Sequence, residues 1–381
     1  MKNNNPFQQF DQVEDPRQQG KIRHPLDKIF LIVLGATLTG ADDWESMEEF
    51  ARSREHWLST IVDMSTGIPS ADTLARVFSL IDPEQFRVAF IDWVQNIIEF
   101  AEQDSGTLLP SVIAIDGKTL RRSHDRSAGK LPIHMVNAWC NQTNLILGQL
   151  KTNEKSNEIT AVPELLKLID IKGRLITADA MSCQKQIVKT CIDQGADYLL
   201  AVKNNQPTLL TEIDDHLGGR KPRAYKRPEI DFYSTDEFNR DRHEIRRCWV
   251  TPIGNKISKG EDWAGLTAII RVESVRTHKG KESVEQKYYI SSKHLSAEEA
   301  LHASRSHWGV ESMHWMLDVG FNEDDNRTRK GYSAENLAVM RQLTLNILKK
   351  DKTCKLGIKN KRLKAAYSQE YFELIIASIS A

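Results

Sequence analysis

The chain has 381 residues, enough for one large core or for two to three smaller ones. It contains 52 basic and 52 acidic residues, so a strongly basic or strongly acidic protein is excluded. The charges are unevenly distributed. The first 110 residues hold roughly twice as many acids as bases, whereas residues 327–365 hold about twelve bases and two or three acids. This asymmetry indicates a basic C-terminal surface for a polyanion, with an ordinary solvated surface as the alternative.

The cysteine pattern and the apolar runs limit the class of protein further. The five cysteines form no C-x-x-C pair, which argues against a structural zinc site or a disulfide framework and favours a reducing cytosol. The longest apolar run, residues 29–38, is too short to span a bilayer, and no signal-peptide pattern precedes it. We therefore expect a soluble, cytoplasmic protein with no membrane partner.

The N-terminal part is predicted to be helical. Residues 1–22 are rich in Asn, Gln and Asp and are expected to form a flexible arm, whereas residues 23–105 have a helical period and predict a small all-α domain. Its helices are expected over 27–38 and 42–62, then from Ser70 as an N-cap, and from Asp82 with Pro83 in the first turn. The step through 65–69 resembles a helix-turn-helix and makes DNA end binding possible, although most such helix pairs bind nothing.

From residue 109 the pattern is that of an α/β protein. Residues 109–203 alternate strand-like and helix-like runs and predict the first part of a mixed-sheet core, with residues 132–140 and 144–151 as a hairpin. Residues 204–292 predict a β-rich insertion. It is expected to pack beside the edge of the sheet where the candidate catalytic residues described below lie. Residues 293–350 resume the core, and a capping box at Ser296 opens the helix that carries Glu311. Residues 351–381 form a basic tail.

Two apolar strand-like runs end on an aspartate, one at Asp116 and one at Asp179. In a mixed sheet of this order the two strands are expected to be parallel neighbours, which places both carboxylates at one edge, where catalytic groups collect. Such oxygen ligands suit a pair of Mg²⁺ ions that cleave a phosphodiester. The alternative is that each aspartate caps a turn or a helix, a common role that Gly117 strengthens for the first of them.

Glu311 lies on a helix face that also carries Trp308 and Trp315, which predicts a buried face. A buried carboxylate requires a metal or an ion-pair partner, for which Arg305 and Arg341 are candidates. Together with Asp116 and Asp179, Glu311 therefore completes a predicted three-carboxylate metal site.

A di-iron helical bundle is a rival interpretation of the same helix. His307, Glu311 and His314 share a face, and Glu311-x-x-His314 resembles the ligand pair of such bundles. That site needs a second Glu-x-x-His pair on another helix, and the sequence contains none that fits. We expect His307 to pack near the active site instead and to contact a phosphate or a metal-bound water.

Polar and basic side chains surround these acids in the sequence and could neutralise phosphates, although each taken alone is as readily a solvated surface group. The candidate DNA contacts are Lys118, Arg121, Arg122, Lys203, Asn205, Gln206, Arg242, Arg246, Arg247, His307, Arg327, Arg329 and Lys330.

Five segments together resemble the H-repeat-associated transposases, a group of the insertion-sequence DDE transposases of bacteria. They are Ile-Asp-Gly-Lys at 115–118, Thr-Ala-Asp-Ala-Met at 177–181, Val-Lys-Asn-Asn-Gln-Pro at 202–207, Tyr-Tyr-Ile-Ser-Ser at 288–292 and His-Trp-Gly-Val-Glu-Ser-Met-His-Trp-Met-Leu-Asp-Val at 307–319. The resemblance extends from about residue 10 to 350. It implies a ribonuclease-H-like core interrupted by the β insertion, with Asp116, Asp179 and Glu311 as the metal-binding triad.

The resemblance also implies a function. We expect a transposase that cleaves and joins DNA at the inverted-repeat ends of its element, with two Mg²⁺ ions that Mn²⁺ can replace. Joining needs two ends held together, so double-stranded DNA and a second copy of the chain are the expected partners. The alternatives are a silent DNA-binding relic and a structure-selective nuclease. A related branch carries Tyr, Arg and Lys where this chain has Ser304, His307 and Asp318, which makes a DNA hairpin step doubtful.

Overall fold

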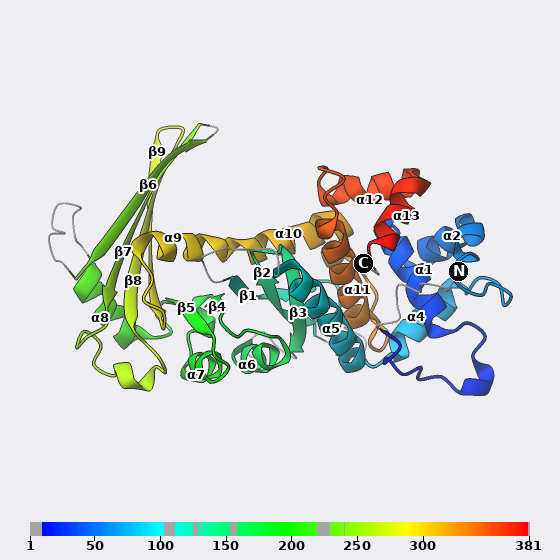
Figure 1. Ribbon diagram of the computed structural model, residues 1–381, viewed down its shortest axis with the longest axis horizontal. Helices are drawn as coiled ribbons and strands as arrows, with labels where there is room; N and C mark the ends of the chain where they lie inside the picture. Colours follow the sequence, from blue (N-terminus) through cyan, green and yellow to red (C-terminus); the bar gives the residue numbers. More distant parts are fainter. Residues whose placement is uncertain are drawn as a thin grey trace.

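The computed structural model describes residues 10–102, 111–124, 129, 131–152, 158–218, 229–239 and 241–379. The molecule is elongated, with a sheet that extends from one end to the middle and a body of helices at the other end (Figure 1). It is a mixed α/β protein, as the sequence predicts. Among the described residues, no helix is long and apolar enough to cross a membrane.

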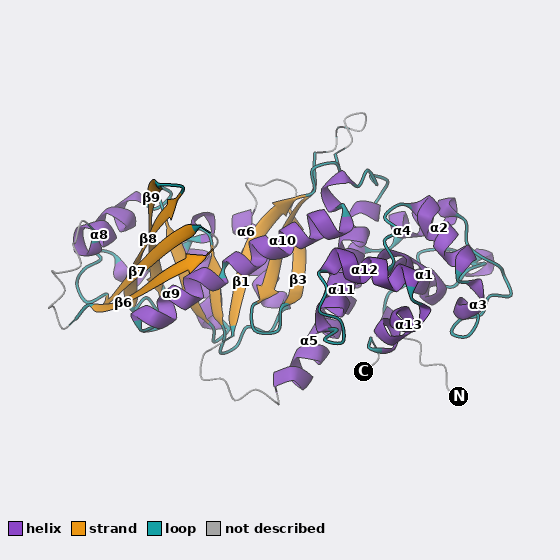
Figure 2. Cartoon of the chain, turned by 90° about the horizontal axis from the view of Figure 1, so that it is seen from above, coloured by secondary structure: helices purple, strands orange, loops and turns teal. Residues whose placement is uncertain are grey.

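A single nine-stranded sheet runs through the molecule, in the order β3-β2-β1-β4-β5-β9-β8-β7-β6 (Figure 2). β1, β4 and β5 are parallel to one another, and the remaining neighbours are antiparallel. The strands are β1 (Val112–Thr119), β2 (His134–Cys140), β3 (Leu145–Thr152), β4 (Leu175–Ala178), β5 (Asp197–Val202), β6 (Asp231–Asn239), β7 (Arg242–Pro252), β8 (Ala268–His278) and β9 (Lys281–Ser291).

The first five strands confirm the predicted core. Every residue of β2 and β4 is buried, because helices cover both faces of the sheet there. β2 and β3 form the predicted hairpin, and Asn144 in its turn takes a left-handed backbone with φ of 58°. Parallel pairing of β1 with β4 places Ile115 opposite Ala178. The next residue on each strand is therefore one of the two predicted catalytic aspartates.

The segment 204–292 is β-rich as predicted, but its relation to the sheet differs from the prediction. β9 pairs with β5 from Leu199 opposite Ser291 to Val202 opposite Tyr288, so β6 to β9 continue the central sheet. The expectation that this segment stands beside the sheet is therefore wrong. The physical reason is that β5 would otherwise present an unpaired edge, which the apolar end of β9 covers. The segment also contains a helix that was not predicted, α8 (Pro207–Leu217).

The N-terminal helices largely follow the prediction. They are α1 (Leu26–Leu38), α2 (Trp44–Ser53), α3 (Glu55–Leu58), α4 (Ala71–Leu80) and α5 (Pro83–Glu102). Ser70 caps α4 by accepting a hydrogen bond from the backbone of Thr73, as expected. The single helix expected over 42–62 is instead split into α2 and α3. The described part of the expected flexible arm is anchored, because Phe10 is buried against the rings of Phe30 and Phe86. Residues 1–9 lie outside the described residues.

Helices cover both faces of the sheet. In Figure 1, α6 (Glu158–Leu168) and α7 (Lys185–Asp193) lie below it, and α9 (Ala297–Ser306) and α10 (Trp308–Phe321) lie above it. Ser296 caps α9 with the predicted capping box. The chain then turns through α11 (Ser333–Lys350), which is almost wholly buried.

The C-terminal segment forms two further helices, α12 (Ile358–Tyr367) and α13 (Gln369–Ala377). The ring of Phe372 packs against Phe50 and Trp57 of the N-terminal helices. Residues 351–379 are therefore part of the helical body, and the N-terminal helices share one apolar core with the C-terminal ones. Lys352, Lys355, Lys359 and Lys364 are exposed on this body, whereas Lys361 and Arg362 are buried in it.

Candidate active site

Asp116 and Asp179 lie on neighbouring parallel strands at the same level of the sheet. Asp116 is within β1, and Asp179 directly follows β4. Adjacent strands are about 4.8 Å apart, so the two backbones lie side by side. Asp179 also accepts a hydrogen bond from the backbone N–H of Ser182 at 3.3 Å and caps a short 3₁₀ helix, Ala180–Ser182. The capping role considered for this aspartate therefore exists alongside its place at the sheet edge.

The environment of Asp116 joins the three predicted acids electrostatically. Burial is the main cause that raises the pKa of this carboxyl to about 7. The negative charges of Asp179, Glu158 and Glu311 contribute to the rise, and a hydrogen bond from the Gly117 backbone opposes it. Parallel pairing of β1 with β4 places Asp179 beside Asp116 in the sheet, and the charge of Glu311 acts on Asp116 from α10.

Glu311 is in the first turn of α10, on a face that is exposed rather than buried. Trp308 and Trp315, on the same face, are 45% and 64% exposed. The expectation of a buried tryptophan-lined face is therefore wrong, because the apolar side of α10 that packs on the sheet carries Val310, Met313 and Leu317 instead. Neither proposed arginine partner binds Glu311: Arg305 pairs with Glu237 at 3.0 Å, and Arg341 is buried elsewhere.

His314 of α10 lies against Asp116, and His307 lies against the strand that leads to Asp179. His314 Nδ1 is 3.5 Å from Asp116 Oδ2, and its Nε2 is 3.2 Å from the Asn137 amide nitrogen. His307, which separates α9 from α10, is 3.2 Å from the hydroxyl of Thr177. Burial lowers the pKa of His307 to about 4 and that of His314 to about 3. Both imidazoles are therefore neutral at pH 7.

A buried polar chain that sequence reasoning missed supports His314. Asn137 is directly opposite Asp116 in the sheet and is 1% exposed. Its amide oxygen accepts a hydrogen bond of 2.7 Å from Gln342 of α11, and its amide nitrogen donates to His314. The neutral ring then presents its Nδ1–H to Asp116. The sequence feature that could have revealed this chain is Asn137, a polar residue inside a largely apolar strand.

The residues fit a divalent cation by their chemistry. Carboxylate oxygens are hard ligands of the kind that Mg²⁺ and Mn²⁺ prefer. Burial, with a smaller contribution from the neighbouring acids, raises the pKa of Asp116, and a bound cation would favour its charged form. In the part of the chain that the structure describes, no three His, Cys, Asp or Glu side chains converge closely enough to hold an ion as they stand. The di-iron interpretation gains no support, because His307 and His314 are largely buried whereas Glu311 is exposed.

Comparison with known proteins identifies the family. The family described as "Transposase DDE domain" matches residues 107–347, and the one described as "DDE_Tnp_1-associated" matches residues 7–94. The chain belongs to the DDE transposases. The protein named "Putative transposase YncI" of Escherichia coli O157:H7 is 42% identical over 97% of this chain and 93% of its own length. The "H repeat-associated putative transposase YhhI" of Escherichia coli strain K12 is 40% identical over 96% of each.

A solved structure, the piggyBac transposase synaptic complex with hairpin DNA, aligns with 96% of this transposase and 74% of that chain at 13% identity. Its TM-score of 0.43 is too low to carry an argument about function.

The candidate DNA contacts of the transposase fall into different environments. Lys118 is buried and binds Asp318 and Glu323, so its charge is used inside the protein. Asn205 and Gln206 donate to the backbone oxygens of Ala180 and Cys183, which braces the loop after Asp179. Other candidates are exposed or partly exposed and lie outside this loop: Arg121, Arg122, Lys203, Arg327, Arg329 and Lys330. Of these, Arg121 and Arg122 pair with Asp324 and Asp325.

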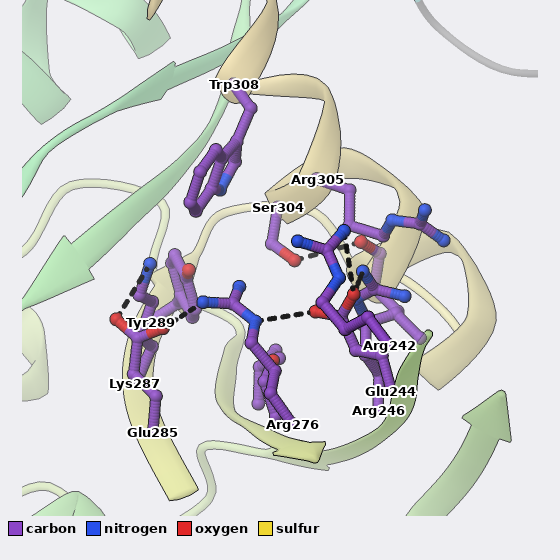
Figure 3. A pocket seen from close by; sticks show the side chains of 13 residues that line it. Arg242, Glu244, Arg246, Arg276, Glu285, Lys287, Tyr289, Ser304, Arg305 and Trp308 are labelled. Carbon is purple, nitrogen blue, oxygen red and sulfur yellow. Dashed lines mark hydrogen bonds and ion pairs between the residues drawn. The ribbon is translucent and has the colours of Figure 1, made fainter. Parts of the chain in front are cut away.

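The arginines of β7 divide between the two faces of the sheet. Arg242 and Arg246 line a hollow of about 320 Å³ between β7–β9, α9 and the start of α10 (Figure 3). Arg247 instead pairs with Glu273 on the other face. The expectation that all three face the same ligand is therefore wrong, because adjacent residues of a strand point to opposite faces. Arg276 and Lys287 also line this hollow and lie over the ring of Trp308, three residues before Glu311.

Ser304, His307 and Asp318 stand where the related branch has Tyr, Arg and Lys, and each of them contacts another residue of the protein. The Ser304 hydroxyl donates to the Leu301 carbonyl, His307 contacts Thr177, and Asp318 pairs with Lys118. None of these side chains provides the planar fork of an arginine for a phosphate.

Proposed function

We propose that this transposase cleaves and joins DNA at the inverted-repeat ends of its own element, with Asp116, Asp179 and Glu311 holding two Mg²⁺ ions that Mn²⁺ can replace. The observation that carries this proposal is the shared environment of the three acids. Asp116 and Asp179 follow paired positions of adjacent parallel strands, and the charge of Glu311 acts on Asp116 from the helix above. Membership of the DDE family supports the same assignment.

The residues of the chain would act chiefly by holding the carboxylates and the DNA in the correct orientation. Bound Mg²⁺ supplies Lewis acidity that activates a hydroxyl nucleophile and stabilises the leaving oxygen of a phosphodiester. His314, held by Asn137, orients the Asp116 carboxylate, while the Ser182 backbone and the Asn205 side chain fix the loop of Asp179. Glu311 completes the set from an exposed helix face, which leaves room for a DNA strand beside it.

The strand order supports a ribonuclease-H-like assignment of the core. β3-β2-β1-β4-β5, with β2 antiparallel between its neighbours and β1, β4 and β5 parallel, is the arrangement that the resemblance implies. Arg242 and Arg246 of the hollow at Trp308 and the basic residues after α10 would bind phosphates of element-end or target DNA. The acting form would be a homodimer on DNA in the bacterial cytoplasm, since joining requires two ends at once.

The test is cleavage and joining of a labelled duplex that carries the element's own end, in Mg²⁺. We expect Asp116→Asn, Asp179→Asn and Glu311→Gln each to lower cleavage by at least about a thousandfold while duplex affinity changes little. Asp193→Asn is the matched control, because Asp193 is an exposed acid paired only with Lys189 on the surface. It should cleave like the unchanged protein.

Three other outcomes would contradict the proposal. Cleavage without joining would indicate a structure-selective nuclease. Duplex binding without cleavage by the unchanged protein would indicate a silent relic. Full activity in any of the three variants would remove that residue from the catalytic set.

A further inference from the structure

A second hollow lies beside the catalytic helix, at the opposite end from the one at Trp308. It has a volume of about 510 Å³ and lies between the second half of α10, the end of α11 and the start of α12. Trp315, Val319 and Leu356 contribute apolar surface to it. We call it the lysine hollow, because Lys349, Lys352, Lys355 and Lys359 also line it.

The positive charge of the lysine hollow is not balanced from within. Its carboxylate, Asp351, is buried and already accepts bonds from Lys361, Tyr371 and Thr353. Among the described residues, no acidic group lies within ion-pair distance of Lys352, Lys355 or Lys359. An uncompensated group of lysines around a concavity attracts an anionic ligand.

The apolar part of the lysine hollow is open to solvent. Trp315 is 64% exposed, Leu356 is 50% exposed and Val319 is 43% exposed. A large aromatic ring left open beside other apolar groups marks an interaction surface. Trp315 follows Glu311 by four residues, so it lies on the same helix face about 6 Å further along the axis. The hollow is therefore continuous with the face that carries the candidate catalytic carboxylate.

We propose that the lysine hollow binds single-stranded DNA, with an unpaired base stacked on Trp315 and the flanking phosphates on the lysines. The inference rests on the proposed function and extends it to the strand that becomes unpaired beside Glu311. A single strand is favoured over a duplex, because a base within a duplex has no free face for an aromatic ring. Nucleic acid is favoured over a protein partner, because four lysines rim the hollow and its acid is already neutralised.

The position of the hollow gives it a role in the reaction. A strand end released at Glu311 would be held one helical turn away, and this binding would not require the arginines and Trp308 at the other end of the face. The released DNA strand would stay bound to the transposase between cleavage and joining.

The test is fluorescence anisotropy without added metal, using labelled oligo-dT of about twelve nucleotides and a duplex of equal length. We expect Trp315→Ala to weaken oligo-dT binding about tenfold and duplex binding less than about twofold. Lys355→Gln combined with Lys359→Gln should make the negative slope of log affinity against log salt shallower by about 1.4. Trp315→Phe should restore most of the affinity.

The matched controls are Tyr367→Ala, which removes an 85% exposed aromatic ring from outside the hollow, and Lys21→Gln, which removes an exposed charge far from it in sequence. Both should bind oligo-dT like the unchanged protein. The inference is overturned if Trp315→Ala matches Tyr367→Ala, or weakens the duplex and oligo-dT equally. It is also overturned if Trp315→Ala alters only self-association in sedimentation, since the face would then join two copies.

Failure of the lysine-hollow inference can be distinguished from failure of the proposed function. A protein that cleaves its element ends but binds oligo-dT independently of Trp315 overturns the lysine-hollow inference alone. A protein that binds oligo-dT through Trp315 but cleaves nothing overturns the catalytic proposal alone.

Discussion

At the scale of single residues, the candidate catalytic edge depends on polar side chains inside the core. Asn137 is the strand partner of Asp116 and connects His314 to Gln342, which also donates to Gln149. Buried amides of this kind are stable only while their hydrogen bonds are made, so the chain has one preferred arrangement. The orientation of His314 toward Asp116 is a consequence of that arrangement.

Replacing Asn137 tests this dependence. We expect Asn137→Ala to lower the free energy of unfolding by about 1–3 kcal/mol, because Gln342 loses a buried acceptor. Cleavage of the labelled element end should fall about tenfold or more, with duplex affinity unchanged. Asn346→Ala is the matched control, because Asn346 is also buried and bonds both backbone groups of Ile146 away from the site. Equal cleavage rates in the two variants would show that Asn137 is only structural.

At the scale of elements, the junction of α11, α12 and α13 is organised by one buried acid. Asp351 follows α11 directly and receives hydrogen bonds from Thr353, from Tyr371 of α13 at 2.7 Å and from Lys361 of α12 at 3.2 Å. Burial by itself raises the pKa of Asp351, but these bonds outweigh it and lower the pKa to about 2. The same acid holds the floor of the lysine hollow in place.

The lowered pKa predicts how stability depends on pH. The folded protein holds this proton less tightly than the unfolded chain, so the contribution is complete above the usual pKa of 3.8 and is lost as the pH falls through about 2. The free energy of unfolding, measured with urea, should decrease between about pH 4.5 and pH 2.5 in both the unchanged protein and Asp351→Asn. We expect this decrease to be about 1–2 kcal/mol smaller in Asp351→Asn than in the unchanged protein. Asp193→Asn should follow the unchanged protein. Parallel curves for both variants would contradict this assignment.

At the scale of the whole molecule, one buried arginine joins segments that are distant in the sequence. Arg362 of α12 donates to the Thr37 carbonyl at the end of α1, to the Gly320 carbonyl near the end of α10, and to Asp42 at 2.7 Å. It also lies over the ring of Phe321 at 4.3 Å. The N-terminal helices, the catalytic helix and the C-terminal helices are therefore held at one point.

Removing this arginine should loosen the helical body. We expect Arg362→Met to lower the free energy of unfolding by about 3–5 kcal/mol, because it leaves Asp42 and two carbonyls without their buried donor. Limited proteolysis should then cleave first near the C-terminal helices. Arg52→Met is the control, since Arg52 is in an exposed pair with Glu48 and should cost less than about 0.5 kcal/mol. A similar small loss for Arg362→Met would contradict its role as a joint.

The sequence by itself determined the local features of this protein. Apolar runs ending at Asp116 and Asp179, the caps at Ser70 and Ser296, and the hairpin turn near Asn144 depend on neighbouring residues, so periodicity and turn chemistry revealed them. α8 was not predicted, although Pro207 in its first turn and Leu209, Ile213 and Leu217 follow a helical pattern. β6 was not predicted as a strand of its own either. β6 is largely exposed on both faces, so its sequence carries no clear alternation of apolar and polar residues.

Only the tertiary structure decided which side chains face one another across long distances in the chain. Lys118 lies among the predicted DNA contacts by sequence, yet it binds Asp318, 200 residues away, inside the protein. Trp308 and Trp315 are typical core residues, yet they are exposed because Val310, Met313 and Leu317 occupy the packed side of α10. Burial and ion pairing are properties of the assembled fold, so no local pattern could have settled them.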